Sequence, residues 1–171
     1  MKTTHHSEYL KLQSVFIKPV KNAFVSDSHL GEQWQPLNYL SRPDFDSALE
    51  EYKTFQEYFT NNNIETHSFP FDEGVKTDSI YCRDASIATD FGMIICNMGK
   101  GGRINEPQSH QEVYKQNNIP ILGIIEAPGT LEGGDVAWLD EKTLAVGHTY
   151  RTNPEGIKQL KALLEPKGVE V

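Results

Sequence analysis

Two carboxylates flank a short β-like run at residues 78–84. Asp78 and Asp84 are six positions apart, and alternate residues of a strand point to the same face, so we expect both acids on one side. In an ideal strand they would lie about 20 Å apart, or closer if the ends curl inward. The spacing fits either a pair of functional acids or two solvated strand ends.

A second acidic pair encloses two glycines, because residues 131–135 read Leu-Glu-Gly-Gly-Asp. The glycines between Glu132 and Asp135 permit unusual backbone angles and let another backbone or a ligand come close. The simpler alternative is a Gly-Gly turn that opens a hairpin. The fragment alone leaves both interpretations open.

Residues 99–103 form another glycine-rich segment that ends in Arg103. This segment lacks the GxxxxGK[ST] pattern of a phosphate-binding loop, so no such loop is predicted. Arg103 and Glu106 have the i, i+3 spacing that lets two side chains pair at the start of a helix.

Neither a metal site nor a cofactor site is predicted. The six histidines form no HxxxH or HxH pair; they are His5, His6, His29, His67, His110 and His148. The two cysteines have no CxxC spacing, and Cys82 is interpreted as a small core residue rather than a nucleophile. No Ser or Cys is evidently paired with His148.

Four motifs occur in order along the chain: Asp-Ser…Arg-Asp at 78–84, Arg-x-x-Glu at 103–106, Leu-Glu-Gly-Gly-Asp-Val at 131–136 and Gly-x-x-x-Arg-Thr-Asn-x-x-Gly-Ile at 147–157. Together they resemble the dimethylargininase branch of the guanidino-group-modifying superfamily, which also includes arginine deiminases and amidinotransferases. The resemblance extends from about Ser14 to Val171. It implies the pentein fold, in which five ββαβ modules are arranged like propeller blades around a substrate channel.

The resemblance also implies roles for five residues. In this family a Cys attacks the guanidinium carbon and a His acts as general acid and base; Glu132 would orient that His. Asp84 would grip the guanidinium nitrogens, since a planar cation is best held by paired carboxylate acceptors. Asp78 would face the substrate α-ammonium group, and Arg103 and Arg151 would face its α-carboxylate.

Two departures from the family pattern matter. Arg83 stands where dimethylargininases often carry a second acid, which is closer to the Arg-Asp pair of deiminases and amidinotransferases. The family's catalytic His and Cys lie downstream of Val171, and neither Cys82, Cys96 nor His148 matches them. We therefore expect the chain to be the N-terminal portion of a pentein, with C-terminal modules absent and no activity by itself.

The leading hypothesis is thus part of a dimethylargininase-like hydrolase of arginine or methylarginine. The alternatives are an amidinotransferase or arginine deiminase, a non-catalytic binding module that has lost its nucleophile, and an unrelated α/β domain with chance motifs. The expected partners are a small guanidino substrate and, because a partial propeller exposes apolar faces, a second copy or a complementary C-terminal chain.

The elements that must position these residues follow from periodicity. Helical stripes predict three helices, at about Asp44–Asn62, Glu106–Asn117 and Pro154–Glu165. Ser41 is the expected N-cap of the first, with Pro43 in its first turn and Asp44 as a further capping acid; Thr152 or Asn153 caps the third. Seven β-like runs are predicted: Ser14–Ile17, Ile64–Phe69, Ile80–Cys82, Met93–Cys96, Ile121–Ile125, Val136–Leu139 and Thr143–Val146.

The recurring order of these elements predicts a partial five-bladed α/β-propeller. About three ββαβ modules are expected, at about 10–70, 78–126 and 132–171, within a single domain of residues 1–171. The segment Lys21–Asn38 has little periodicity and is predicted to be a long functional loop.

Composition excludes several classes of protein. The chain has 171 residues with 24 acidic and 16 basic side chains, a formal net charge of −8. It has no basic run for nucleic-acid binding and no apolar run of the roughly 18 residues that would span a membrane. Its polar start, residues 1–6, lacks the apolar stretch of a secretory signal. With too few cysteines for a disulfide framework, a cytoplasmic α/β protein is predicted.

Overall fold

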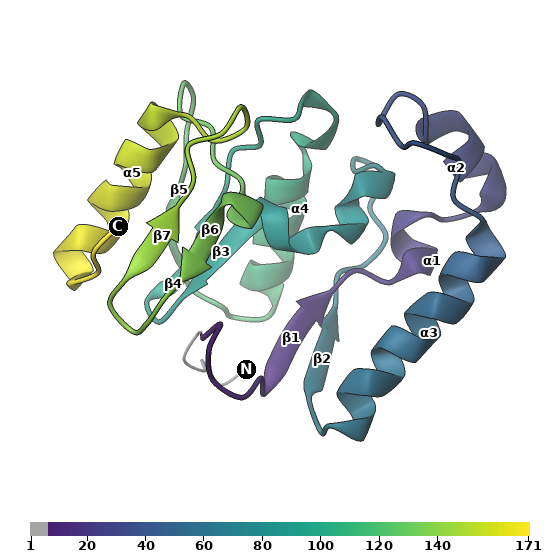
Figure 1. Cartoon of the computed structure of the whole chain (residues 1–171), viewed down its shortest axis with the longest axis horizontal. Helices are drawn as coiled ribbons and strands as arrows, with labels where there is room; N and C mark the ends of the chain where they lie inside the picture. Colours follow the sequence, from purple (N-terminus) through teal and green to yellow (C-terminus); the bar gives the residue numbers. More distant parts are fainter. Residues whose placement is uncertain (1–6) are drawn as a thin grey trace. The chain divides into compact units, whose positions relative to one another are not determined.

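The computed structural model describes residues 7–171 of an α/β chain (Figure 1). The polar start at residues 1–6 lies outside the described residues. The chain divides into two compact units, Leu12–Cys82 and a second unit formed by residues 7–11 with Arg83–Val171. The expected single domain of residues 1–171 stays a prediction. None of the helices in residues 7–171 is long and apolar enough to cross a membrane.

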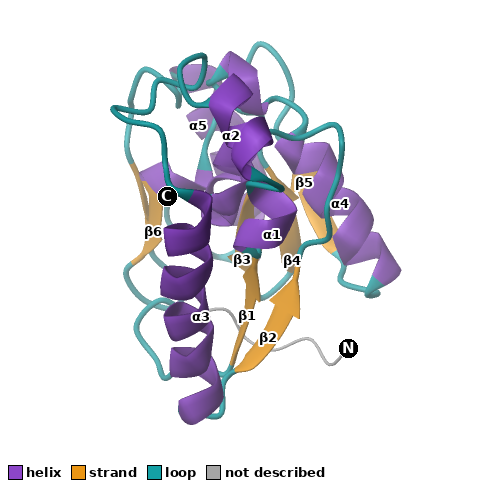
Figure 2. Cartoon of the chain, turned by 90° about the vertical axis from the view of Figure 1, so that its right-hand side faces the viewer, coloured by secondary structure: helices purple, strands orange, loops and turns teal. Residues whose placement is uncertain are grey.

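The unit Leu12–Cys82 is built on two parallel strands and one long helix. Strand β1 (Ser14–Ile17) pairs with β2 (Glu65–Ser68), and α3 (Phe45–Asn61) runs alongside them in Figures 1 and 2. The N-cap of α3 is Asp44, whose side chain accepts a hydrogen bond from the Ser47 backbone N–H. The expectation of Ser41 as the cap was wrong, because the helix begins after Pro43 rather than with it.

The predicted loop at Lys21–Asn38 contains helical structure, which corrects the sequence interpretation. Helix α1 (Val20–Ala23) overlaps the start of this segment, and helix α2 (Asp27–Gln33) lies inside it. Ser26 caps α2. Helices of one or two turns are too short to show a periodic apolar stripe. Their buried residues form a small core with the apolar stripe of α3 and with Ile80: Val20, Ala23, Phe24, Leu30, Phe45, Ala48, Leu49 and Tyr52.

The strand predicted at Ile80–Cys82 is absent from the structure, which has two 3₁₀ helices there, Thr77–Ile80 and Cys82–Ala85. Backbone groups in this segment form hydrogen bonds of the turn type, such as the 3.0 Å bond from the Tyr81 N–H to the Asp78 carbonyl oxygen. The argument that Asp78 and Asp84 share a strand face therefore does not hold, since side chains do not alternate in a 3₁₀ helix.

The second unit contains a three-stranded sheet in the order β3-β4-β5. Strand β3 (Ser86–Thr89) is antiparallel to β4 (Gly92–Ile95), which is parallel to β5 (Ile121–Ile124). Helix α4 (Glu106–Gln116) connects β4 to β5. This is the expected ββαβ order, although β3 was not among the predicted strands.

A hairpin and a helix follow. Strands β6 (Val136–Trp138) and β7 (Leu144–Val146) are antiparallel, and α5 (Pro154–Leu164) begins at Asn153, whose side chain accepts a hydrogen bond from the Gly156 N–H. A single parallel bridge joins Thr143 to Glu170 after the helix. Short 3₁₀ turns complete the unit at Gly101–Arg103, Gly133–Asp135 and Glu165–Lys167.

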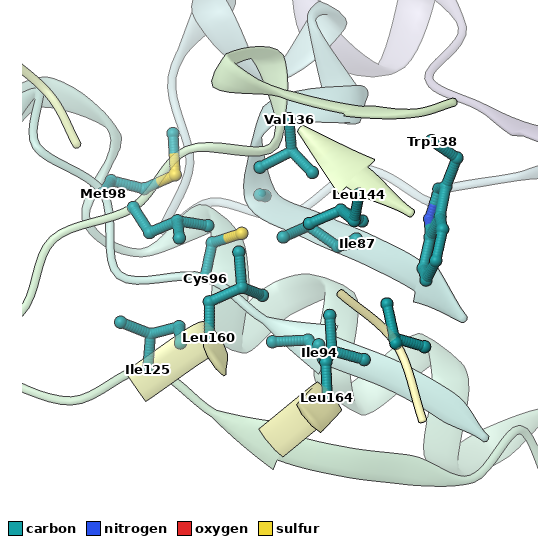
Figure 3. Close-up of a cluster of buried hydrophobic side chains, with 13 residues drawn as sticks. Ile87, Ile94, Cys96, Met98, Ile125, Val136, Trp138, Leu144, Leu160 and Leu164 are labelled. Carbon is teal, nitrogen blue, oxygen red and sulfur yellow. The ribbon is translucent and has the colours of Figure 1, made fainter. Parts of the chain in front are cut away.

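The main hydrophobic core lies in this second unit (Figure 3). In Figure 3, Leu160 of α5 lies against Cys96, and Leu164 lies against Ile94 of β4. Gly123 allows α5 to pack onto β5, because a Cβ there would lie only 2.4 Å from Leu163 Cδ2. This core holds the loops at the ends of the strands, which carry the charged residues of the candidate site.

Candidate active site

Gly133 and Gly134 let two acidic segments pack directly against each other. A Cβ on Gly133 would lie 2.3 Å from the Arg83 carbonyl oxygen, and one on Gly134 would lie 2.3 Å from Asp84 Oδ1. Neither glycine has a positive φ. The two glycines are therefore required for close approach rather than for unusual backbone angles, and they place Glu132 beside the segment that carries Asp84.

Asp84 is held by an arginine that is itself held by a second acid. Arg103 Nη1 donates to Asp84 Oδ2 at 2.5 Å. Arg103 Nε and Nη2 donate to the two carboxylate oxygens of Glu106 at 2.8 and 2.7 Å, which confirms the i, i+3 pairing. Burial alone lowers the pKa of Arg103, but hydrogen bonds and charges of Glu106 and Asp84 outweigh it and raise that pKa.

Glu132 is buried, with 1% of its side chain exposed, and faces a second arginine. Its Oε1 accepts a hydrogen bond from the Lys100 backbone N–H at 3.1 Å. Its Oε2 lies 3.0 Å from Arg151 Nη1, an ion pair without hydrogen-bond alignment. Among residues 7–171, neither Glu132 Oε2 nor Arg151 Nε has a hydrogen-bond partner. The Glu132 carboxylate thus keeps one oxygen available for a further donor.

A hydroxyl network fixes the backbone on both sides of Glu132. Asp135 Oδ2 accepts hydrogen bonds from Thr149 Oγ1 at 2.8 Å and from Thr152 Oγ1 at 2.6 Å. The Glu132 N–H donates to Thr152 Oγ1 at 3.1 Å. In the sequence, Thr152 was included in the motif at 147–157 and considered as a possible helix cap, and Thr149 was not singled out; the Thr-x-x-Thr spacing beside Arg151 was the available signal.

Arg83 supports the glycine segment. It donates to the carbonyl oxygens of Gly133, at 2.5 Å, and Val136, at 2.7 Å, and it also forms an ion pair with Glu8. The residue that departs from the dimethylargininase pattern therefore braces the loop that carries Glu132.

Neither Cys82 nor Cys96 forms a disulfide, and the two thiols differ in burial. Burial raises the pKa of the Cys96 thiol, a hydrogen bond from the Gly133 backbone lowers it, and the charges of Asp84 and Glu132 raise it further. Cys96 is thus close to both site carboxylates, in surroundings that disfavour a thiolate. Cys82 is half-buried, and its Sγ donates to the Phe16 carbonyl oxygen at 3.7 Å. His148 is exposed, and no group of three metal-binding side chains occurs in residues 7–171.

Asp78 belongs to the other unit, Leu12–Cys82. It is buried and acts on Tyr39, whose pKa is raised by burial and then by the charge of Asp78. Four of the five expected site residues therefore lie in one compact unit, where Asp84 pairs with Arg103 and Glu132 with Arg151. The location of Asp78 relative to these four, and the roles of all five, stay predictions.

The chain matches one family model and is similar in sequence to two bacterial enzymes. The family model described as arginine deiminase matches residues 43–169. The N(G),N(G)-dimethylarginine dimethylaminohydrolase of Pseudomonas aeruginosa is 30% identical over 132 residues, which are 77% of this chain and 51% of that protein. The enzyme of the same name from Streptomyces coelicolor is 32% identical over 129 residues, 75% of this chain and 48% of that protein.

Solved structures agree on the fold. The Pseudomonas aeruginosa enzyme, in a variant complexed with citrulline, aligns with a TM-score of 0.74 and 26% identity over 94% of this chain and 60% of that one. The N-terminal domain of ArgZ, a cyanobacterial arginine dihydrolase, aligns with a TM-score of 0.74 but only 13% identity, over 92% of this chain and 56% of that one. The second likeness is one of fold alone.

The chain spans about half the length of the curated relatives it matches. The family match nevertheless covers most of the chain and includes Asp84, Arg103, Glu132 and Arg151. The chain therefore belongs to the arginine deiminase family, in the superfamily of guanidino-group-modifying enzymes that includes the dimethylargininases.

Proposed function

We propose that this chain forms part of a dimethylargininase-like hydrolase that cleaves a C–N bond of arginine or methylarginine. The observation that carries the proposal is the convergence of Asp84 and Glu132 at the Gly133-Gly134 contact. Each carboxylate has an arginine partner, so the two like charges can lie in one site. Two relatives of 30% and 32% identity are named for this activity.

The proposed roles follow from position and burial. Asp84 is 19% exposed, and it binds the guanidinium group of the substrate through charge-assisted hydrogen bonds. Glu132 orients a catalytic histidine through the second ring nitrogen of that histidine, for which its Oε2 is suited. Arg151, 32% exposed, binds the α-carboxylate, and Asp78 binds the α-ammonium group. Arg103, 3% exposed and bonded to both Asp84 and Glu106, supports Asp84 in this proposal rather than the α-carboxylate.

The nucleophilic cysteine and the catalytic histidine come, in this proposal, from outside these 171 residues. A thiolate must attack the guanidinium carbon to form the covalent intermediate, and the burial that raises the pKa of Cys96 opposes thiolate formation. Water alone does not attack a resonance-stabilised guanidinium readily. We therefore expect no citrulline from arginine or methylarginine with this chain alone.

The proposal also includes a propeller fold, a cytoplasmic location and association with another chain. The β3-β4-α4-β5 order, and the β6-β7-α5 order that ends in the Thr143–Glu170 bridge, support ββαβ modules of a five-bladed α/β-propeller. A cytoplasmic location suits two cysteines that form no disulfide. Exposed large apolar side chains, such as Leu40 and Tyr150, support association with a second copy or a complementary chain, which light scattering measures.

Isothermal titration calorimetry of this chain tests the proposal, with L-arginine and N(G),N(G)-dimethyl-L-arginine as ligands and L-lysine as a cation without a planar guanidinium. We expect binding of the guanidino compounds, a loss of at least tenfold in Asp84→Asn, and nearly unchanged affinity in Glu132→Gln. Glu165→Gln, an exposed change directly after α5, is the matched control.

Three outcomes would contradict the proposal. Equal binding of lysine and arginine, or an unaffected Asp84→Asn variant, would remove the guanidinium site. Citrulline formation that survives Cys82→Ser and Cys96→Ser would refute the external nucleophile. Guanidino binding without turnover by any longer product of the same reading frame would favour the non-catalytic binding module.

Arginine deiminase activity is the second candidate, favoured by the family model that matches and by the Arg83-Asp84 pair. The two activities leave different amines, since a deiminase releases ammonia from arginine and a dimethylargininase releases dimethylamine from dimethylarginine. Assaying both amines with the full reading frame distinguishes them.

A further inference from the structure

We propose that Glu106 is a positioning residue that sets the Asp84 carboxylate through Arg103. This inference rests on the proposed function, because it assigns a supporting residue to the proposed guanidinium-binding acid. Glu106 was noted in the sequence only as a pairing partner at a helix start.

The geometry of the pair leaves Arg103 little freedom. Three of the five N–H donors of the guanidinium are in the bonds described above, two to Glu106 and one to Asp84. A planar fork bound at two adjacent nitrogens cannot rotate without breaking both bonds. The orientation of the Arg103 Nη1–H that meets Asp84 is therefore determined by Glu106.

Burial makes this arrangement rigid. Side-chain exposure is 3% for Arg103 and 1% for Glu106, so water cannot replace either partner. Glu106 is the first residue of α4, where the positive end of the helix dipole stabilises a carboxylate. The pair is thus anchored to a helix rather than to a loop.

The same face of α4 also holds the strand that follows Asp84. Glu106, His110 and Tyr114 are four residues apart and share one face of the helix. Ser86 Oγ lies 2.8 Å from Tyr114 Oη and 3.3 Å from His110 Nδ1. The side chain of Ser86 is therefore held by α4 directly and that of Asp84 through Arg103, while a Cβ on Gly134 would lie 2.3 Å from Asp84 Oδ1.

The consequence is specific to Asp84. Asp84 Oδ2 accepts the hydrogen bond from Arg103, which restricts rotation of the carboxylate. The orientation that Asp84 presents to a ligand is therefore determined before the ligand binds. A pre-set carboxylate loses less conformational entropy when it binds a planar cation. Removing the Glu106 charge frees Arg103 to turn and leaves Asp84 without a fixed orientation, although Asp84 itself is unchanged.

The test compares Glu106→Gln with Glu106→Asp and with Glu112→Gln. Glutamine nearly preserves shape but presents an NH₂ group to one of the two Arg103 donors; aspartate keeps the charge. Glu112 is the matched control, because it forms an i, i+3 ion pair with Lys115 on the exposed part of the same helix. Arg103→Lys serves as a second variant, which keeps a charge but cannot bind two carboxylates side by side.

The first readout is the Arg103 Nε–H resonance in NMR, which needs no ligand. It is expected to be protected from solvent exchange in the unaltered chain and in Glu112→Gln, and to lose at least tenfold in protection in Glu106→Gln. Unchanged protection in Glu106→Gln would overturn the proposal even if no guanidino compound binds at all.

The second readout is the affinity for L-arginine by calorimetry. We expect a loss of about tenfold in Glu106→Gln and in Arg103→Lys, with partial recovery in Glu106→Asp and no change in Glu112→Gln. A folded Glu106→Gln variant with lost Arg103 protection but unchanged affinity would overturn the positioning role. If the unaltered chain binds no guanidino compound, the proposed function fails separately, and the NMR result still decides whether Glu106 fixes Arg103.

Discussion

The two compact units bury polar side chains by different means. In the unit formed by residues 7–11 with Arg83–Val171, buried charges meet opposite charges, as in the pairs that Arg103 makes with Asp84 and Glu106. In the unit Leu12–Cys82, two amine or amide groups bond to backbone: Lys18 Nζ donates to the Pro70 carbonyl oxygen at 2.5 Å, and Asn22 Nδ2 to that of Phe69 at 3.0 Å.

The difference separates two tasks. A side chain bonded to a backbone carbonyl oxygen holds two stretches of chain together. Such a bond does not orient a carboxylate. A buried ion pair contributes little net stability relative to an apolar pair, but it fixes the direction of each charged group. The charge-paired unit is therefore suited to present Asp84 and Glu132 to a ligand in fixed orientations, whereas the bonds of Lys18 and Asn22 hold loops of the unit Leu12–Cys82.

Replacing Arg103 by Met tests this comparison most severely. The change keeps much of the side-chain volume but leaves the carboxylates of Glu106 and Asp84 without their cation. Because an uncompensated buried charge is strongly destabilising, the free energy of unfolding should fall by about 3–5 kcal/mol. Urea unfolding followed by circular dichroism measures it, with the exposed Lys158→Met as control. A loss below about 1 kcal/mol would mean that the pairs carry no structural role.

Gly133→Ala probes the backbone contact on which the charge-paired unit depends. The added Cβ would meet the Arg83 carbonyl oxygen at 2.3 Å, and backbone cannot move aside as a side chain can. We expect a destabilisation of about 2–3 kcal/mol, at the upper end of the effect of overpacking. Gly101→Ala is the matched control, since nothing lies within 4 Å of its Cβ, and its stability should change by less than about 0.5 kcal/mol.

Lys18→Met measures the corresponding bond in the other unit. The variant keeps the apolar stem and loses the charge-assisted bond to the Pro70 carbonyl oxygen. The expected loss is about 1.5 kcal/mol in urea unfolding, because the net contribution of one hydrogen bond to a charged group is modest. A loss as large as that of Arg103→Met would erase the distinction between the two units.

Sequence patterns predicted the local features of both units. Helices α3, α4 and α5 were found within about one residue of their ends. The segments of α3 and α5 combine an apolar stripe with a recognisable start, whereas that of α4 is polar and only weakly patterned. The pairing of Arg103 with Glu106 followed from their i, i+3 spacing. Interactions between residues close in sequence leave a pattern that can be recognised without the fold.

What could not be predicted depends on contacts between distant segments. Ile80–Cys82 was assigned to a strand, but the structure has 3₁₀ helices at Thr77–Ile80 and Cys82–Ala85, with hydrogen bonds of the turn type. Strand β3 was missed because its sequence, Ser-Ile-Ala-Thr, has little apolar character. The glycine contact with Asp84 spans about fifty residues and has no signature in local spacing. The bonds of Thr149 and Thr152 to Asp135 span 14 and 17 residues, and the Thr-x-x-Thr spacing does not indicate their partner.

The two units also differ in the residue that caps a helix, and this difference should have the smallest effect on stability. In one unit α3 is capped by the carboxylate of Asp44, whereas in the other α5 is capped by the uncharged amide of Asn153. The hydrogen bond from the Ser47 backbone, assisted by the charge of Arg42, lowers the pKa of Asp44 below its ordinary value of 3.8. The contribution of this cap is therefore complete above that value and is lost as the pH falls through the lowered pKa.

Asp44→Asn should give α3 the kind of cap that α5 already has. Asparagine still accepts the Ser47 bond, so the melting temperature at pH 7 should fall only slightly, while the decrease between pH 5 and pH 2 should be smaller than in the unaltered chain. Asp46→Asn, in the first turn of α3 but outside the cap, controls for net charge. If both variants show the same pH dependence, the effect comes from overall charge, and the contrast between a charged and an uncharged cap has no energetic consequence.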